Sequence, residues 1–314
     1  MQKQRTKSPL NKMADRKRTI VGLGELLWDL LPSGKQLGGA PANFAYITNL
    51  LGDYGIPASR IGCDSLGEEA LQRLTQLGLS ASFVQRDSVH PTGTVNVKID
   101  ATGQPCFEIL HPVAWDYLEW TEEWKHLARE ADAVCFGSLA QRSPRSQSTI
   151  RSFLNATRRE AIRIFDVNLR QNFYSREVLA ESMSLATMVK LNHEELPKIM
   201  ALFELEHRNE KDSARHLLSL HGLQLICVTR GDAGSLLVSA DEYSEHPGIK
   251  VKVTDTVGAG DAFTAAMVHA YLRGAPLDQI NELGNRVGAW VASQSGATPT
   301  PKAGSLPQTL ADIV

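Results

Sequence analysis

The chain has 314 residues, of which 42% are hydrophobic and 22% charged, a composition typical of one large globular domain with or without a small appendage. Its 33 Lys and Arg against 35 Asp and Glu lack the basic excess of a nucleic-acid-binding protein, so no nucleic-acid partner is expected. No apolar run approaches membrane-spanning length, and the basic residues 1–18 have no apolar stretch of the kind found in a signal peptide. We therefore expect a solvated tail over 1–18, no membrane partner and a cytoplasmic protein.

Strand and helix patterns alternate along the rest of the chain. In chain order they predict a strand at 19–24, helices at 41–51 and 68–77, strands at 133–136, 162–166, 188–191 and 225–229, and helices at 258–273 and 277–293. This rhythm is typical of an α/β fold with a doubly wound, mainly parallel central sheet flanked by helices. Residues 19–314 are therefore expected to form the folded domain.

Residues 92–112 depart from this alternation of strands and helices. Apolar and polar residues alternate over 94–99 and again over 106–109, with a turn at 101–104 between them. This pattern predicts a β-hairpin, which with part of 25–40 would form a small β lid over a site. An edge hairpin of the main sheet is the alternative. The apolar positions of the hairpin would also suit a homodimer contact through the lid.

The cysteines and histidines indicate no metal centre. The four cysteines form no CxxC pair and have apolar or small neighbours, so we expect reduced core residues at Cys63, Cys106, Cys135 and Cys227. The nine histidines form no zinc pattern, since the His193-Glu194-Glu195 segment lacks a second histidine.

Two glycine-rich segments each lead into a predicted helix. At Gly258-Ala259-Gly260-Asp261, small residues allow close approach of a ligand, and the free N–H groups of a helix start attract a phosphate. Asp261 would then be placed to take a proton from an attacking hydroxyl. A turn whose Asp complements the helix dipole is the alternative.

The second segment is Gly38-Gly39-Ala40-Pro41-Ala42-Asn43, with Glu25 and Asp29 upstream, just after the first predicted strand. Ligands of α/β proteins bind at the carboxyl ends of the strands, and Asp29 could accept hydrogen bonds from two hydroxyls of a polyol. A surface loop and an ordinary helix start are the alternative. Neither a Walker A loop nor a GxGxxG follows the first strand.

Segments 38–45 and 255–263 together resemble the N-terminal and C-terminal signatures of the ribokinase/PfkB family of carbohydrate kinases, in that family's order. The resemblance extends from about Thr19 to the end and implies ATP as phosphate donor with Mg²⁺. It implies that Asp261 is the base and that the amides of Gly258, Ala259 and Gly260 form the anion hole. It also implies sugar-binding roles for Asp29, Gly38, Gly39 and Asn43.

The same resemblance implies further ligand contacts. Asn192 and Glu195 match an N-x-x-E element that organises Mg²⁺ and phosphates, often through water; a capping box is the alternative. Residues placed along ATP are Thr229, Gly231, Gly234 and, near the adenine, Asn285. The two glycines could instead only turn the chain, and Asn285 could lie on a solvated helix face. Asp255 and the Val257 carbonyl, with 296–298, correspond to a site for a monovalent cation such as K⁺.

The acceptor is suggested by three segments. Residues 166–170 resemble a D-x-N-x-R element of fructokinases and 2-keto-3-deoxygluconate kinases, while 25–32 and 113–116 resemble fructokinases. Arg170 would bind the acceptor or ATP phosphates, or form a surface salt bridge with Asp166 or Glu177. We expect phosphorylation of fructose to fructose 6-phosphate, with 2-keto-3-deoxygluconate or an adenosine-type nucleoside as alternatives. A relative that binds sugar or nucleotide without catalysis, and an NAD-dependent oxidoreductase, are the alternatives from other classes.

Overall fold

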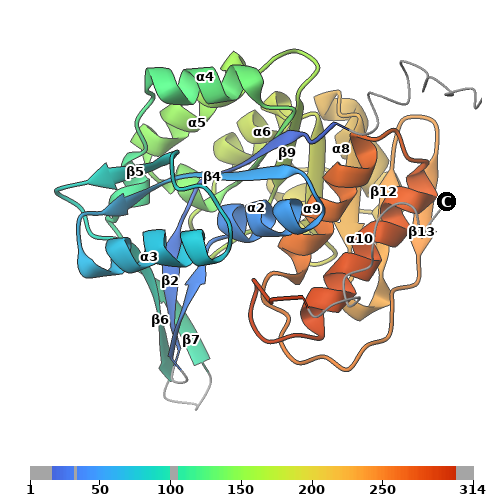
Figure 1. Cartoon of the computed structure of the whole chain (residues 1–314). Coiled ribbons are helices and arrows are strands. Elements are labelled where there is room, and N and C mark those ends of the chain that lie inside the picture. The colour runs from blue at the N-terminus through green and yellow to red at the C-terminus, as the bar shows by residue number, and fades with distance from the viewer. Residues whose placement is uncertain (1–15, 32–33, 100–104, 302–314) are drawn as a thin grey trace, which may run out of the picture.

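The structure, a computed structural model, describes residues 16–31, 34–99 and 105–301 (Figure 1). The first 15 residues of the expected tail and the hairpin turn expected at 101–104 lie outside these ranges. The last tail residues contact the fold, because Arg16 pairs with Asp132 and the Arg18 N–H donates to Asp53 at 2.9 Å. None of the helices within the described ranges is long and apolar enough to cross a membrane.

A nine-stranded sheet forms the centre of the molecule. Its strands are β1 (Thr19–Leu23), β4 (Tyr54–Gly62), β5 (Val84–Asp87), β8 (Ala133–Gly137), β9 (Ile162–Asp166), β10 (Met188–Asn192), β11 (Leu225–Thr229), β12 (Ser235–Val238) and β13 (Tyr243–His246). They lie in the order β13-β12-β11-β10-β9-β8-β1-β4-β5. All neighbours pair in parallel except β11 with β12 and β12 with β13. The predicted doubly wound, mainly parallel sheet is therefore confirmed.

Helices cover both faces of this sheet (Figure 1). One layer consists of α2 (Ala40–Leu50), α3 (Ser65–Gln76), α9 (Ala259–Tyr271) and α10 (Leu277–Ala292). The other consists of α4 (Glu122–Glu130), α5 (Pro144–Ala156), α6 (Arg176–Leu185), α7 (Glu195–Leu202) and α8 (Glu210–His221). Because successive strand side chains point to opposite faces, Ile20 packs in the first layer while Val21 and Leu23 pack in the second.

A separate small sheet projects from the large one (Figure 1). Its strands are β2 (Leu27–Leu31), β3 (Gly34–Gly38), β6 (Gly93–Ile99) and β7 (Pro105–Ile109), in the order β3-β2-β6-β7. The expected hairpin is the antiparallel pair β6–β7, and β2 joins it by pairing in parallel with β6. The hairpin is thus not an edge of the main sheet, as the alternative would have required.

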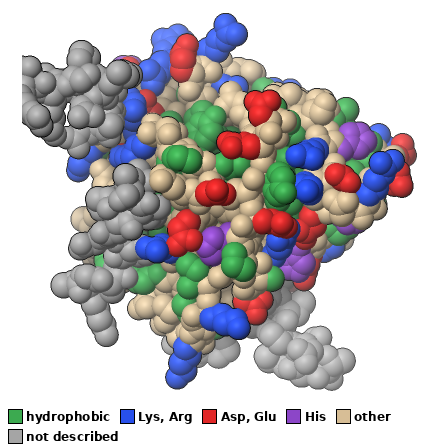
Figure 2. Space-filling model, turned by 90° about the vertical axis from the view of Figure 1, so that its right-hand side faces the viewer, with side chains coloured by type: hydrophobic (Ala, Val, Ile, Leu, Met, Phe, Trp, Pro, Cys, Tyr) green, Lys and Arg blue, Asp and Glu red, His purple; other side chains and the backbone are tan. Residues whose placement is uncertain are grey.

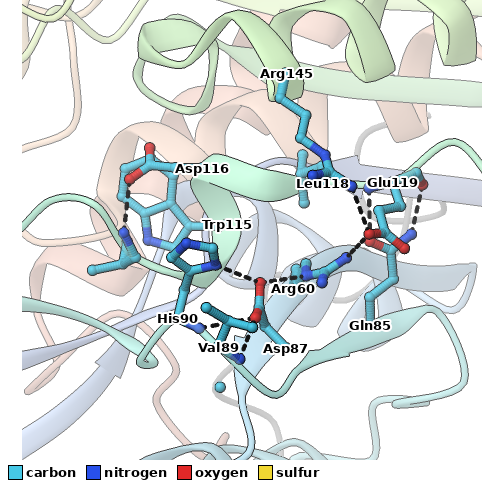
Figure 3. Close-up of polar contacts among 12 residues, drawn as sticks. Arg60, Gln85, Asp87, Val89, His90, Trp115, Asp116, Leu118, Glu119 and Arg145 are labelled. Carbon is cyan, nitrogen blue, oxygen red and sulfur yellow. Dashed lines mark hydrogen bonds and ion pairs between the residues drawn. The ribbon is translucent and has the colours of Figure 1, made fainter.

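An ion-pair network, here called the hairpin clamp, holds the two ends of the β6–β7 hairpin (Figure 3). Buried Asp87 accepts hydrogen bonds from Arg60 Nε and from the backbone N–H of His90, both at 2.9 Å. Glu119, beyond the hairpin, pairs with Arg60 at 2.9 Å and Arg145 at 2.7 Å. Burial alone would raise the pKa of Asp87, but these backbone and side-chain partners lower it to about 2. The hairpin clamp therefore ties the segments before β6 and after β7 to the large sheet and α5.

One expectation outside the site is wrong. Cys135 and Cys227 are buried free thiols as expected, but Cys63 is exposed. Figure 2 shows the side of the molecule that carries α8, α10, β12 and β13, where acidic and basic side chains are interspersed.

Candidate active site

The two glycine-rich segments meet in the fold. α2 and α9 pack against each other (Figure 1), and Asn43 in the first turn of α2 donates through Nδ2 to Asp261 Oδ2 in the first turn of α9, at 2.9 Å. The loops after β1, β9 and β10 reach the same region, because the carboxyl ends of parallel strands lie at one edge of the sheet. The site is therefore assembled from five separate parts of the chain.

The start of α9 needs glycine at Gly258 for two reasons. Its φ is +77°, in the left-handed region that glycine adopts without strain, and a Cβ there would lie 2.5 Å from the Ala297 Cβ. No side chain caps this helix, which leaves its N-terminus open to an anion. One of the three predicted anion-hole amides, that of Ala259, already donates to the Thr256 carbonyl at 3.2 Å.

Asp261 is a half-buried carboxylate with an unusual pKa. Burial and, to a lesser extent, the carboxylate of Asp166 raise the pKa to about 6, against the opposing effects of the Asn43 hydrogen bond and the positive charges of Lys190 and Arg170. A carboxylate with this pKa is largely ionised at neutral pH yet is a stronger base than an ordinary Asp. That combination suits the proton acceptor expected at this position.

Of the predicted sugar-binding residues, Asp29 and Gly38 lie together on neighbouring strands of the small sheet, and Gly39 follows at the start of α2. Asp29 on β2 is half-buried, and a Cβ at Gly38 on β3 would overlap its Oδ2 atom. Gly39 has φ +109°, and a Cβ there would lie 2.5 Å from the Glu25 carbonyl oxygen. Burial raises the pKa of Asp29, against the opposing positive charge of Arg170. Glycine at Gly38 thus lets the Asp29 carboxylate lie close against β3, and glycine at Gly39 lets the backbone at Glu25 lie close to the start of α2.

Glu25 had no assigned role in the sequence analysis, although its position after the first strand was noted. It is 3% exposed, and its Oε2 atom has no hydrogen-bond partner. Burial and, to a lesser extent, the nearby charge of Asp261 raise its pKa to about 7, against the opposing effects of backbone hydrogen bonds and of Arg170. Glu25 is therefore part of the electrostatic environment of the candidate base.

Arg170 does not form the alternative salt bridge with Asp166, whose partners are Lys190 and Thr264. It donates to the neighbouring Leu169 carbonyl at 3.3 Å. The loop that carries it is tightly turned, with left-handed φ of +44° at Asn168 and +47° at Gln171. Its charge nonetheless acts on the carboxylates of the candidate sugar pocket, as the pKa shifts above show.

Asn192 and Glu195 form the reciprocal hydrogen bonds of a capping box. Glu195 Oε2 accepts from the Asn192 N–H at 2.8 Å, and Asn192 Oδ1 accepts from the Glu195 N–H at 2.9 Å. Glu195 Oε1 also accepts from the Leu169 N–H at 2.8 Å. The carboxylate therefore joins the end of β10 to the loop after β9, which places it at the candidate site.

Residues 229–234, which have the pattern T-x-G-x-x-G, turn the chain between β11 and β12. This is the alternative in which Gly231 and Gly234 only turn the chain. The Arg230 N–H donates to the Gly234 carbonyl at 2.7 Å, and Gly231 and Gly234 both have positive φ. Thr229 ends β11, at the same sheet edge as Asn192. The turn is compatible with a nucleotide contact but is explained without one.

Asn285 does not lie on a solvated helix face. It is 7% exposed, and its Nδ2 donates to Ser235 Oγ at 2.7 Å and to the Asn281 carbonyl at 2.9 Å. Its amide nitrogen thus helps to pack α10 on β12.

Asp255 joins the two loops of the expected cation site. Its Oδ1 accepts from the Val257 N–H at 3.0 Å, and its Oδ2 accepts from the Gly296 N–H at 3.1 Å. Over the described ranges no three His, Cys, Asp or Glu side chains gather as metal ligands.

Lys190 and Thr264 were missed by the sequence analysis. Lys190 lies on β10, where its Nζ donates to both carboxylate oxygens of Asp166 at 3.1 and 3.2 Å. Thr264 Oγ1 contacts the same carboxylate at 3.1 Å. The one sequence signal for the Lys190–Asp166 pair was a lysine in a strand predicted to be buried. A buried lysine requires a partner of opposite charge, so a buried carboxylate could have been sought.

Comparison with known proteins shows the family of the chain. The model of the pfkB family carbohydrate kinases matches residues 33–303. A fructokinase of Klebsiella pneumoniae is 31% identical over 259 residues, which are 78% of this chain and 82% of that protein. An uncharacterized sugar kinase of Pyrococcus horikoshii is 28% identical over 302 residues, covering 90% and 93% of the two chains.

Solved structures show the same fold. The crystal structure of the Pyrococcus horikoshii sugar kinase in complex with ATP has a TM-score of 0.77 and covers 90% of this chain and 95% of that one. A ribokinase of Thermotoga maritima, 23% identical, has a TM-score of 0.73 and covers 93% and 96% of the two chains, a likeness of fold alone. The family model spans most of the chain, and the chain belongs to the pfkB family of carbohydrate kinases.

Proposed function

We propose that the chain transfers the γ-phosphate of ATP to a hydroxyl of fructose, with Asp261 as the base. The observation that carries this proposal is the 2.9 Å hydrogen bond between Asn43 and Asp261. This bond joins the first turn of α9, whose N-terminus has no side-chain cap, to the first turn of α2, which follows Gly38 and Gly39. ATP as donor is supported by the ATP complex of the Pyrococcus horikoshii relative.

In this reaction Asp261 takes the proton of the sugar hydroxyl while the hydroxyl oxygen attacks the γ-phosphorus of ATP. The bond from the γ-phosphorus to the β,γ-bridging oxygen breaks, and ADP leaves. The first turn of α9, with Gly258 and Gly260, would bind the transferred phosphoryl group. Asn192, Thr229 and the glycines of the T-x-G-x-x-G turn would lie along the nucleotide.

Mg²⁺ would offset charge on the phosphates. Both oxygens of Glu195 already accept a backbone N–H, but each keeps a second lone pair, so the carboxylate fits a metal held through its water shell. Asp255 and Val257 would flank a monovalent cation such as K⁺. The small sheet would act as a lid that excludes water from the acceptor, which suppresses ATP hydrolysis.

Fructose is favoured by the 31% identical Klebsiella pneumoniae fructokinase. The second candidate acceptor is 2-keto-3-deoxygluconate, because Arg170 acts electrostatically on Asp29, Glu25 and Asp261 and would favour an acidic sugar beside them.

The test is ADP release with fructose, 2-keto-3-deoxygluconate, ribose and adenosine as acceptors, measured for the wild type and Asp261→Asn. We expect fructose to be the best acceptor and the variant to be at least about 1,000-fold slower while binding ATP as well as the wild type. Arg170→Gln is the matched comparison, since it should lower turnover of the acidic sugar more than that of fructose. Near-normal turnover in Asp261→Asn would refute the role of the base, and no ADP release with any acceptor would favour the non-catalytic alternative.

A further inference from the structure

A buried ion pair lies directly beneath the glycine turn of the candidate active site. Lys190 on β10 is 8% exposed and Asp166 at the end of β9 is 4% exposed. The two residues are Cα partners in the parallel register of these strands, so their side chains leave the sheet on the same face. A charge pair this deep is costly to desolvate, and no feature of sheet packing requires it.

The pair contacts the first turn of α9 at two points. Thr264 Oγ1 lies 3.1 Å from Asp166 Oδ2 and 3.0 Å from the Gly260 carbonyl oxygen, so its single hydroxyl proton lies between two acceptors, one on the pair and one on the turn. A Cβ at Gly260 would lie 3.0 Å from Lys190 Nζ. Gly260 does not have a positive φ, so its backbone conformation does not demand glycine. A Cβ there would press on the end of the Lys190 side chain, which would have to shift by a few tenths of an ångström.

The two charges of the pair act on the pKa of Asp261 in opposite directions. The Asp166 carboxylate raises the pKa of Asp261, and the Lys190 ammonium lowers it. Lys190 itself stays protonated, because Asp166, Glu195 and Asp261 together raise its pKa despite its burial. The other charged groups that act on Asp261 are Glu25 and Arg170, from the loops after β1 and β9.

We propose that Lys190 and Asp166 are positioning residues for phosphoryl transfer: as a pair they hold the first turn of α9 and set the charge balance around its catalytic carboxylate from the protein side. This inference rests on the proposed role of Asp261 as the base. The short distance between Gly260 and the Lys190 ammonium is one of the contacts through which the pair acts on this turn.

The test compares Asp166→Asn, Lys190→Met and the double variant. The acidic limb of the pH profile of kcat/KM reports the base of the free enzyme. We expect it to move about one pH unit lower in Asp166→Asn, about one pH unit higher in Lys190→Met, and back toward the wild type in the double variant. Lys198→Met, at an exposed position on α7, is the matched control and should leave the limb in place.

Opposite movements distinguish this role from a structural one, since damage to packing lowers activity in both single variants without moving the limb in opposite directions. The inference would be overturned if the acidic limb of kcat/KM stayed at the wild-type pH in both single variants, or moved in the same direction in both. Lys190→Met leaves Asp166 buried without its partner and could fail to fold. In that case Asp166→Asn and the double variant test the inference: the acidic limb should lie at lower pH in Asp166→Asn and return toward the wild-type pH in the double variant.

A second readout does not depend on turnover. In protein with ¹³C-labelled aspartate carboxyls, the Asp261 resonance is identified by its loss in Asp261→Asn and titrated in each variant. Opposite shifts of this titration show that the pair sets the charge balance around Asp261 even if no acceptor yields ADP, an outcome that refutes the proposed function and, with it, a role in phosphoryl transfer. An unchanged titration in both single variants overturns the inference while leaving the kinase activity intact.

Discussion

Removal of the Asn43 amide should move the pH dependence of catalysis. In Asn43→Ala the Asp261 carboxylate loses a charge-assisted hydrogen bond, an interaction typically worth about 1.5–3 kcal/mol, which moves the acidic limb of kcat/KM upward by about one to two pH units. The wild-type limb should lie near the pKa of Asp261, about 6. At pH 7 the reduced ionisation alone should therefore lower kcat/KM about two- to tenfold, and the loss should largely vanish above about pH 9.

The assay is ADP release at subsaturating fructose from pH 5 to pH 9.5, at constant ionic strength. Asn49→Ala is the matched control, because Asn49 lies on the same helix but bonds the Gly55 N–H and the Gly78 carbonyl, away from Asp261. That variant should lose stability without moving the limb. If Asn43→Ala lowers kcat/KM equally at every pH, Asn43 contributes only to sugar binding and the reasoning about Asp261 is refuted.

Three further predictions concern stability and metal dependence. Gly258→Ala should cost about 2–4 kcal/mol in chemical unfolding, from backbone strain plus overlap. Gly78→Ala, with φ +71° but open space, should show only the strain of about 1–2 kcal/mol, and equal losses would refute the overlap. Burial would raise the pKa of Asp53, but His269 and Arg273 lower it to about 2, so its stabilising contribution is present above about pH 4 and lost as the pH falls toward 2. Asp53→Asn should therefore cost about 3–5 kcal/mol at pH 7, and a deficit that persists at pH 2 would contradict this account. Glu195→Gln should raise the Mg²⁺ concentration for half-maximal activity about tenfold, and an unchanged requirement would argue against its role at the metal.

Local features of the site could be predicted from the sequence because they depend on adjacent residues. Gly258 and Pro41 mark helix starts through their own backbone preferences, and the observed helices begin within one residue of the predicted ranges at Ala259 and Ala40. The period-two pattern over 94–109 likewise predicted a hairpin, since register follows alternation.

Long-range pairings could not be predicted in this way. The Lys190–Asp166 pair exists because β9 and β10 are neighbours in a particular register, and neither segment alone encodes its partner. Asn285 has a polar side chain on a helix with one apolar face, so its burial depends on Ser235 lying opposite it.

The hairpin clamp determines how much of the chain would have to be exchanged to alter the lid. Asp87 belongs to the large sheet, while His90 and Glu119 lie on either side of the hairpin. A graft that replaced only 93–109 would join foreign strands to native ends, and one that also removed Glu119 would leave Arg60, whose side chain is 11% exposed, without one of its two carboxylates. A chimera should therefore transfer residues 88–119 as a single block, together with a partner for Arg60, so the transferable unit extends beyond the strands it is meant to replace.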